Sequence, residues 1–333
     1  MFGFGIIGTG NIAKLHADCI DKIPNARLLG VLTKSEFRAR EITGNFNAPV
    51  FWEMEKLLSH PEIDVICVCN ESGLHGTTIA KIAKANKHIL CEKPLETSVE
   101  KIDAIAEIIK IHRVKLACVF QNRENPEYKK LKNHIESGSL GKILLCQTSI
   151  NWFRPPSYYQ DSWRGTLELD GGAALINQGI HTIDLMLDLM GEVDMVSGLV
   201  GTLHHQIEGE DVAVANLKFK SGALGTLSCG TAFFPGEPES ITLYGTLGNI
   251  VFSGGKIVSS TVNSIHSTLG ASDQNQGSGA SDPMAITDQF HIAVIIDIMD
   301  AVRNNRAPKV NIEEAKKSVA LINAIYQSKG NAV

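Results

Sequence analysis

The chain has 333 residues, of which 44% are hydrophobic and 20% charged, a composition typical of a globular protein with two domains of ordinary size. Its formal net charge of −5, with no long run of one sign, excludes a basic nucleic-acid-binding or membrane-surface protein and favours small-molecule partners. No stretch reaches the roughly 18 apolar residues of a membrane span, and no basic leader precedes the first strand, so we expect a cytoplasmic protein.

The seven cysteines lie mostly in apolar segments such as Val65–Cys69 and Ala117–Phe120. Cys67 and Cys69 are too close together for a CxxC motif, and no second Cys or His pair has zinc-ligand spacing. We therefore expect buried, reduced thiols and no metal site.

The first 120 residues alternate short apolar strands with amphipathic helices. Strands are expected at residues 2–7, 28–32, 49–51, 65–68, 88–91 and 115–120, and helices at residues 11–23, 35–46, 77–85 and 99–112. This alternation is typical of a doubly wound parallel sheet with helices on both faces. We therefore predict an α/β domain of the Rossmann type over residues 1–121.

After Gln121 the pattern changes to closely spaced strands in which polar and apolar residues alternate. These strands are expected at residues 143–152, 195–203, 212–219, 223–231, 240–244 and 249–252, with helices at residues 127–137, 289–304 and 312–329. Such alternation predicts an open, mostly antiparallel sheet with helices on one face, in a second α+β domain over residues 122–333. Residues 259–283 are polar and rich in Gly and Ser, which predicts a surface loop.

A glycine-rich turn, Gly8–Ile12 (GTGNI, which includes Thr9, Gly10 and Asn11), follows the first strand and opens the first helix. Gly8 permits a tight turn, Gly10 lets the backbone approach a pyrophosphate, and Ala13 allows close helix packing. The N-terminus of the helix supplies N–H donors for the anion. The turn therefore predicts a dinucleotide site, and the alternative is a purely structural turn.

No carboxylate stands at the end of the second strand, where one normally binds the ribose 2′-hydroxyl. That stretch offers the hydroxyls of Thr33 and Ser35 and the positive charges of Lys34 and Arg38. Because a 2′-phosphate would be bound by such groups, we favour NADP(H) over NAD(H). The alternative is that Lys34 and Arg38 are solvated charges at a helix start.

Two further segments carry groups suited to proton transfer. Lys93 leaves the carboxyl end of a buried strand, the edge at which open α/β sheets bind ligands, and the alternative is an ordinary solvated lysine. At about 100° per residue, Asn177, His181, Asp184 and Asp188 fall on one helical stripe beside an apolar stripe. This indicates a helix at a cleft edge with His181 as general acid or base, and the alternative is a solvent-facing row.

Together these motifs resemble the Gfo/Idh/MocA oxidoreductases over nearly the whole chain. The resemblance is carried by the segments GIIGTGNIAKLHA, HILCEKPLE, FQNRENPEY and DGGAALINQGIHTIDLMLDLMG. It implies a cis Lys93–Pro94 bond, and it implies that Lys93 and His181 flank the substrate carbon that faces the nicotinamide. It also implies a homodimer or homotetramer built on the exposed sheet. The remaining residues expected at the cofactor are Asn70, His75, Glu92 and Gln121.

One position departs from many relatives, which carry aspartate where this chain has Asn177. The Asn form resembles the branch that acts on sugar nucleotides and oxidises a ring hydroxyl such as that on C3. We expect Trp163 and Arg164 to contact the sugar or its acidic group. The same pocket is expected to include Tyr158, Tyr159 and Arg123, with ordinary interface packing as the alternative for the aromatic residues.

These observations predict an NAD(P)-dependent oxidoreductase that moves a hydride to or from a hydroxyl-bearing carbon of a sugar-like substrate. Two alternatives stay open. One is a glycosidase of the same family that oxidises C3 transiently, and the other is a non-catalytic sensor of the dinucleotide.

Overall fold

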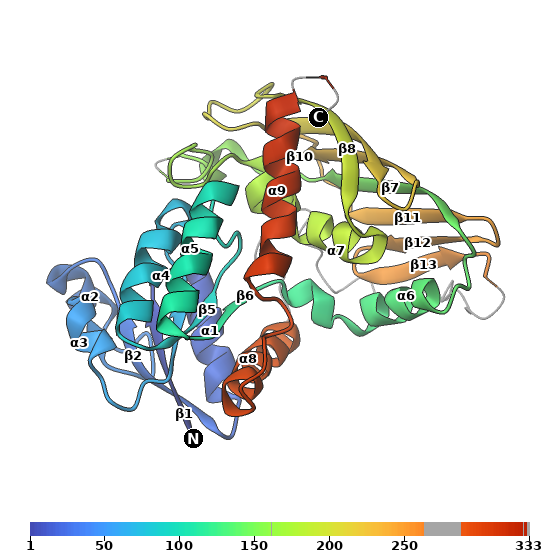
Figure 1. Cartoon of the computed structure of the whole chain (residues 1–333). Helices are drawn as coiled ribbons and strands as arrows, with labels where there is room; N and C mark the ends of the chain where they lie inside the picture. Colours follow the sequence, from blue (N-terminus) through green and yellow to red (C-terminus); the bar gives the residue numbers. More distant parts are fainter. Residues whose placement is uncertain (161, 263–287, 329, 332–333) are drawn as a thin grey trace. The chain divides into compact units, whose positions relative to one another are not determined.

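The structure is a computed structural model that describes residues 1–160, 162–262, 288–328 and 330–331. The described chain forms two compact units. The first unit contains residues 1–121 and 288–316, and the second contains residues 122–262 and 317–331. Figure 1 shows both units coloured along the sequence. Helix α9 (Ile312–Ser328) is divided between the units at residue 316.

The first unit is built on a six-stranded parallel sheet in the order β3-β2-β1-β4-β5-β6. Its strands are β1 (Phe2–Ile7), β2 (Ala26–Leu32), β3 (Val50–Phe51), β4 (Val65–Val68), β5 (His88–Cys91) and β6 (Leu116–Cys118). Its helices are α1 (Asn11–Asp21), α2 (Glu36–Ile42), α3 (Met54–Leu58), α4 (His75–Lys84), α5 (Val99–His112) and α8 (Asp288–Arg303). Helices α4 and α5 lie side by side (Figure 1). Buried apolar runs such as β4 are typical of a parallel sheet covered on both faces.

Helix α8 belongs to the first unit, although the predicted second domain included it. Its apolar residues Val294, Ile295, Ile298 and Met299 join the same buried cluster as α1 and the parallel sheet. The prediction was wrong because position in the sequence said nothing about which core would bury this apolar face.

The second unit contains a seven-stranded sheet in the order β13-β12-β11-β7-β10-β9-β8, in which only the pairing of β7 with β10 is parallel. Its strands are β7 (Ile143–Asn151), β8 (Val193–Gly201), β9 (Val212–Phe219), β10 (Leu224–Gly230), β11 (Ser240–Gly245), β12 (Asn249–Ser253) and β13 (Lys256–Ser260). Helices α6 (Pro126–Glu136) and α7 (Ile180–Met190) contact this sheet. The two units confirm the predicted fold class.

Two smaller elements add to those predicted. The short helix α3 and strand β13 were not predicted, and β13 includes the first two residues of the predicted surface loop. The rest of that loop from residue 263 onward lies outside the described residues. All seven cysteines are buried thiols, as expected. None of the helices in the described part of the chain is both long and apolar enough to cross a membrane.

Candidate functional site

The glycine-rich turn follows β1 and begins α1, as predicted. Gly8 has φ +118°, and a Cβ atom there would lie 2.5 Å from the carbonyl oxygen of Cys69, so only glycine fits. Gly10 is the N-cap of α1, and a Cβ atom there would meet no atom within 4 Å. Thr9, Asn11 and Ile12 complete the turn and begin the helix. The backbone of the turn is therefore open to a ligand at the N-terminus of α1.

Two buried polar atoms at the same sheet edge fit a dinucleotide. Asn70 follows β4 and Gln121 follows β6, and neither Asn70 Oδ1 nor Gln121 Oε1 has a hydrogen-bond partner among the described residues. Buried acceptors of this kind are expensive to leave unpaired, whereas hydroxyl and amide donors of a ligand would satisfy them. These residues and the open turn at Gly10 fit the nicotinamide dinucleotide that the motif implies.

Glu92, predicted to contact the cofactor, forms a buried ion pair with His16 of α1. His16 Nε2 lies 2.7 Å from Glu92 Oε1. Burial alone would lower the pKa of His16, but its polar contacts with Cys67 and Glu92 raise it to about 10. Burial alone would raise the pKa of Glu92, but the hydrogen bond with His16 lowers it to about 2. Both groups are therefore charged at neutral pH, and the pair links α1 to the turn that follows β5.

Lys93 occupies the same turn and is half-buried. Its main-chain N–H donates to Glu92 Oε2 at 3.3 Å, so the carboxylate paired with His16 also holds the backbone of the lysine. The Lys93–Pro94 bond is cis, as the resemblance implied.

His75, also predicted at the cofactor, is buried between backbone groups of the protein. Its Nδ1 lies 2.9 Å from the carbonyl oxygen of Pro94, and its Nε2 lies 3.1 Å from that of Asn70. Burial lowers the pKa of His75 in spite of these hydrogen bonds. We assign His75 a positioning role, because both ring nitrogens contact the loops that carry Asn70 and Lys93.

Three of the four residues on which the preference for NADP(H) depends have other partners for their side chains in the structure. Ser35 caps α2 by accepting a hydrogen bond from the N–H of Arg38 at 3.2 Å. Lys34 pairs with Glu71 at 2.5 Å and Arg38 with Glu41 at 2.9 Å. Thr33 is buried, and its N–H donates to the carbonyl oxygen of Phe51.

In the second unit, a π-helix over Ala174–Gly179 leads into α7. Buried Glu210 accepts hydrogen bonds from the N–H groups of Ala173 (3.2 Å) and Leu175 (2.7 Å), which satisfies donors at the start of this segment. A Cβ atom at Gly179 would lie 2.7 Å from Cys229 Sγ, so the segment packs closely against β10. π-Helices are rare and often occur at functional sites.

The π-helix carries a polar network. Asn177 Nδ2 donates to Asp170 Oδ1 at 2.7 Å, and Gln178 Nε2 donates to Asn177 Oδ1 at 2.9 Å and to the Tyr158 hydroxyl at 2.8 Å. Gln178 Oε1 accepts from the guanidinium of Arg154, which is 1% exposed and lies over the Tyr158 ring. Hydrogen bonds with Asp170 and Gln178 therefore hold the Asn177 side chain in place.

The predicted polar stripe does not act as one group, because Asp184 and Asp188 form ion pairs that do not include Asn177. Asp184 is buried and accepts two hydrogen bonds of 2.8 Å from Arg123, whose guanidinium also lies 3.4 Å from Asp188. Asp188 in addition pairs with Lys132. The cleft-edge interpretation was therefore wrong for Asp184 and Asp188, because they neutralise basic groups of the same unit. We assign Arg123 to this ion-pair network and do not retain it as a substrate ligand.

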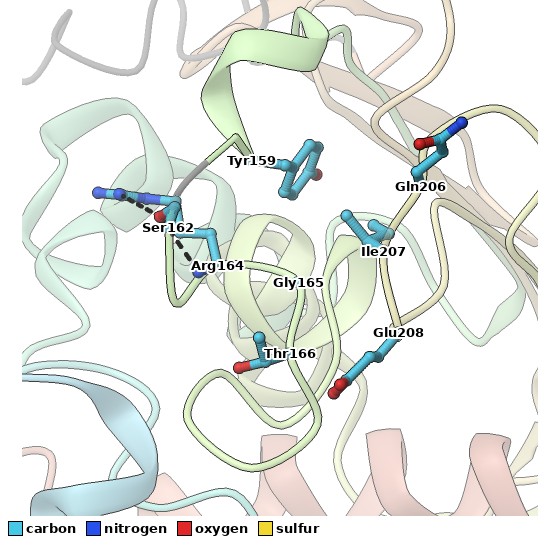
Figure 2. A pocket seen from close by; sticks show the side chains of 8 residues that line it. All are labelled: Tyr159, Ser162, Arg164, Gly165, Thr166, Gln206, Ile207 and Glu208. Carbon is cyan, nitrogen blue, oxygen red and sulfur yellow. Dashed lines mark hydrogen bonds between the residues drawn. The ribbon is translucent and has the colours of Figure 1, made fainter.

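A pocket of about 360 Å³ lies in the second unit (Figure 2). Its walls are formed by Tyr159, Ser162, Arg164, Gly165, Thr166, Gln206, Ile207 and Glu208. The guanidinium of Arg164 lies 4.9 Å from the centre of the Tyr158 ring and 5.2 Å from that of Trp163. Tyr158, Trp163 and Arg164, predicted to act together, thus lie together.

The pocket and the π-helix are connected by hydrogen bonds, although neither Asn177 nor His181 is among the described residues that line the pocket. Asp170 accepts from Asn177 on one oxygen and from the N–H of Gly165, in the pocket wall, on the other at 2.8 Å. Tyr159 lines the pocket, and its hydroxyl donates to Thr231 at 2.9 Å. His181 itself is half-buried on the first turn of α7.

Three residues that position these groups were not predicted from the sequence, namely His16, Asp170 and Glu210. Their signals were present: Asp170 precedes the Gly171-Gly172 pair, and His16 lies on the buried side of the first helix. No pattern in the sequence, however, joined residues as far apart as His16 and Glu92.

Comparison with known proteins identifies the family. A family model described as "Oxidoreductase family, NAD-binding Rossmann fold" matches residues 2–120, and one described as "GFO/IDH/MocA C-terminal domain" matches residues 128–251. The chain belongs to the Gfo/Idh/MocA family. It is accordingly a nicotinamide-dinucleotide-dependent oxidoreductase, and the predicted family, enzyme class and general function are confirmed.

Relatives of this Gfo/Idh/MocA chain include enzymes that act on cyclitols and sugar nucleotides. The myo-inositol 2-dehydrogenase of Thermotoga maritima is 32% identical over 253 residues, which are 74% of this chain and 73% of the relative. The scyllo-inositol 2-dehydrogenase (NAD(+)) of Bacillus subtilis is 26% identical over 317 residues, which are 92% of this chain and 87% of the relative. The WlbA dehydrogenase of Bordetella pertussis, solved with NADH and UDP-GlcNAcA, has a TM-score of 0.88 and 28% identity, covering 100% of this chain and 97% of its own.

The His16–Glu92 pair predicts a large stability effect. In His16→Leu, Glu92 keeps a buried charge without its cation, so we expect the free energy of unfolding in urea to fall by about 3–5 kcal/mol at pH 7. The double variant His16→Leu/Glu92→Leu is the control and should regain much of this loss, because it buries no charge. If the free energy of unfolding falls equally in the single and double variants, the charges of His16 and Glu92 do not stabilise each other strongly.

The contribution of the His16–Glu92 pair to the free energy of unfolding changes with pH in a defined direction. The pKa of His16 is raised from 6.5 to about 10, so its contribution is complete below pH 6.5 and is lost as pH rises through 10. The pKa of Glu92 is lowered from 4.5 to about 2, so its contribution is lost as pH falls through 2. Urea unfolding between pH 6 and pH 10 should therefore show a loss of stability in the wild type that the double variant lacks.

Proposed function

We propose that this oxidoreductase oxidises a secondary ring hydroxyl, such as that on C3, of a nucleotide-linked sugar that carries a carboxylate. The observation that carries the proposal is Arg164, a residue of the pocket wall whose guanidinium lies over the rings of Tyr158 and Trp163. A guanidinium binds a carboxylate through two parallel hydrogen bonds, and aromatic faces pack against sugar rings. The Bordetella relative, which was solved with UDP-GlcNAcA, supports this class of substrate.

Asn177 orients the substrate in this proposal. Its amide is fixed by Asp170 and Gln178, so it offers hydrogen bonds in set directions. Because an amide does not titrate near neutral pH, it holds a hydroxyl without exchanging a proton. A relative with aspartate at this position would instead place a charge beside the histidine.

From the family resemblance alone, we propose that His181 and Lys93 both act on the reacting hydroxyl. A neutral imidazole can accept a proton, whereas an ammonium group can only donate one. We assign the proton to the imidazole of His181 and the stabilisation of the developing negative charge on the oxygen to Nζ of Lys93. The bound nicotinamide supplies the hydride acceptor.

We propose that the cofactor is held by the turn at Gly8–Ile12 and by Asn70 and Gln121, with His75 and Glu92 as positioning residues. The preference for NADP(H) depended on Lys34 and Arg38 as phosphate ligands, and their pairing with carboxylates weakens it.

We also propose that the outward face of the second sheet joins copies of this chain. Three rows of residues run across the paired strands and face outward, and nearly all of these residues are small or uncharged. The rows are Leu199, Val214, Ser228, Ser149 and Ser240; Ser197, Asn216, Thr226, Gln147 and Thr242; and Lys218, Leu224, Leu145 and Tyr244. A broad uncharged face of this kind is typical of symmetric self-association, and sedimentation of the purified chain tests it.

Replacing Lys93 with Met is expected to lower kcat by at least about 100-fold, because the variant loses the charge that stabilises the developing oxyanion. NADH affinity, measured by fluorescence titration, should stay within about twofold. Turnover is followed as NADH formation from NAD⁺ and UDP-GlcNAcA. Lys84→Met, which removes an exposed lysine of α4, is the matched control and should leave both quantities unchanged. Normal turnover in Lys93→Met would remove the lysine from the mechanism.

Replacing Arg164 with Met is expected to raise KM for UDP-GlcNAcA roughly 10- to 100-fold, because a charged hydrogen bond is worth about 1.5–3 kcal/mol. The neutral analogue UDP-GlcNAc provides the control, and its KM should change by less than about threefold. Equal changes for both sugars would show that Arg164 does not recognise the carboxylate.

A further inference from the structure

Lys34 and Glu71 form an ion pair that joins the ends of two strands. Lys34 follows β2 and Glu71 follows β4, and β1 lies between these two strands in the sheet. Lys34 Nζ lies 2.5 Å from Glu71 Oε1. Because the carboxyl ends of parallel strands meet at one edge, this pair shares its edge with the glycine-rich turn that follows β1.

The pair brings a carboxylate to a position where the sequence lacks one. Dinucleotide-binding folds place an acidic residue at the end of β2 to bind the ribose hydroxyl, and this chain has Thr33, Lys34 and Ser35 there. Glu71 approaches Lys34 from a different strand. Its side chain is 12% exposed, against 83% for Lys34, so the carboxylate is the fixed member of the pair.

The charges around this edge are balanced. Burial alone would raise the pKa of Glu71, but hydrogen bonds with Lys34 and with its own backbone lower it, so the carboxylate is ionised at neutral pH. Each of the three basic side chains in residues 34–42, which follow β2 and include α2, pairs with a carboxylate. These pairs are Lys34–Glu71, Arg38–Glu41 and Arg40–Glu36. They offer no surplus positive charge to a 2′-phosphate.

We infer that Glu71 makes this chain select NAD(H) over NADP(H), by accepting a hydrogen bond from the adenosine ribose and repelling a 2′-phosphate. Glu71 thus takes the role that an acidic residue at the end of β2 has in other dinucleotide-binding folds. The inference rests on the proposed function only in requiring that the chain binds a nicotinamide dinucleotide. Without the charge of Glu71, Lys34 becomes a ligand for the 2′-phosphate.

The test is equilibrium binding of NADH and NADPH to the purified full chain, measured by calorimetry and without substrate. The wild type should bind NADH at least tenfold more tightly than NADPH. Glu71→Gln should shift the ratio of the two Kd values toward NADPH by at least threefold, and adding Lys34→Met should reverse that shift. Glu41→Gln, which removes the matched carboxylate beside Arg38, is the control and should leave the ratio within threefold. If Glu71→Gln does not fold, Glu71→Ser replaces it under the same criterion.

A wild type that prefers NADPH, or a ratio in the Glu71 variant within threefold of the wild type, overturns the inference. In either case the proposed function stands, because a dinucleotide still binds. If the wild type binds neither nucleotide, that result would instead contradict the proposed function.

Discussion

The cofactor-binding unit depends on the buried ion pair between His16 and Glu92. His16 lies on α1, the helix that begins at the glycine-rich turn, and Glu92 begins the turn that carries Lys93. Since a buried charge without a partner is expensive, the imidazolium and the carboxylate must stay together. The pair therefore fixes the spacing between the turn proposed to bind the dinucleotide and the lysine proposed to act on the substrate.

The second unit follows the same principle with different groups. Glu210 satisfies the N–H groups that begin the π-helix, and Asp170 ties Asn177 to the wall of the pocket. These carboxylates contact the backbone and side chains of the protein itself. They hold in place the residues that we propose contact the sugar. A rigid support of this kind is what orientation of a substrate requires.

Much of the first unit could be predicted from the sequence, because its signals are local. The turn at Gly8–Ile12 and the strand leading to Lys93 are each readable within a dozen residues, and the structure has both where they were expected. The assignment of α8 failed because its apolar face fits either core as far as the sequence shows. The core that buries it is decided by packing between segments far apart in the chain.

The helix that carries His181 shows a different limit. A projection at a constant 100° per residue assumes a regular α-helix, whereas the segment before His181 is a π-helix with a wider turn. Asn177, in the π-helix, belongs to a network with Gln178 and Asp170. Asp184 lies on the regular helix α7 and pairs with Arg123, a partner that no helical projection could reveal. Likewise, the positive charge of Lys34 was visible in the sequence, but its pairing with Glu71 was not.

We propose that this chain moves a hydride from a ring carbon of a nucleotide-linked sugar acid to a nicotinamide. The most direct measurement uses NAD⁺ and UDP-GlcNAcA labelled with deuterium at C3, followed by mass spectrometry of the nucleotide. We expect the NADH formed to carry one deuterium, in equal amount to the oxidised sugar. Unlabelled NADH, or recovery of the sugar without any NADH, would contradict the account.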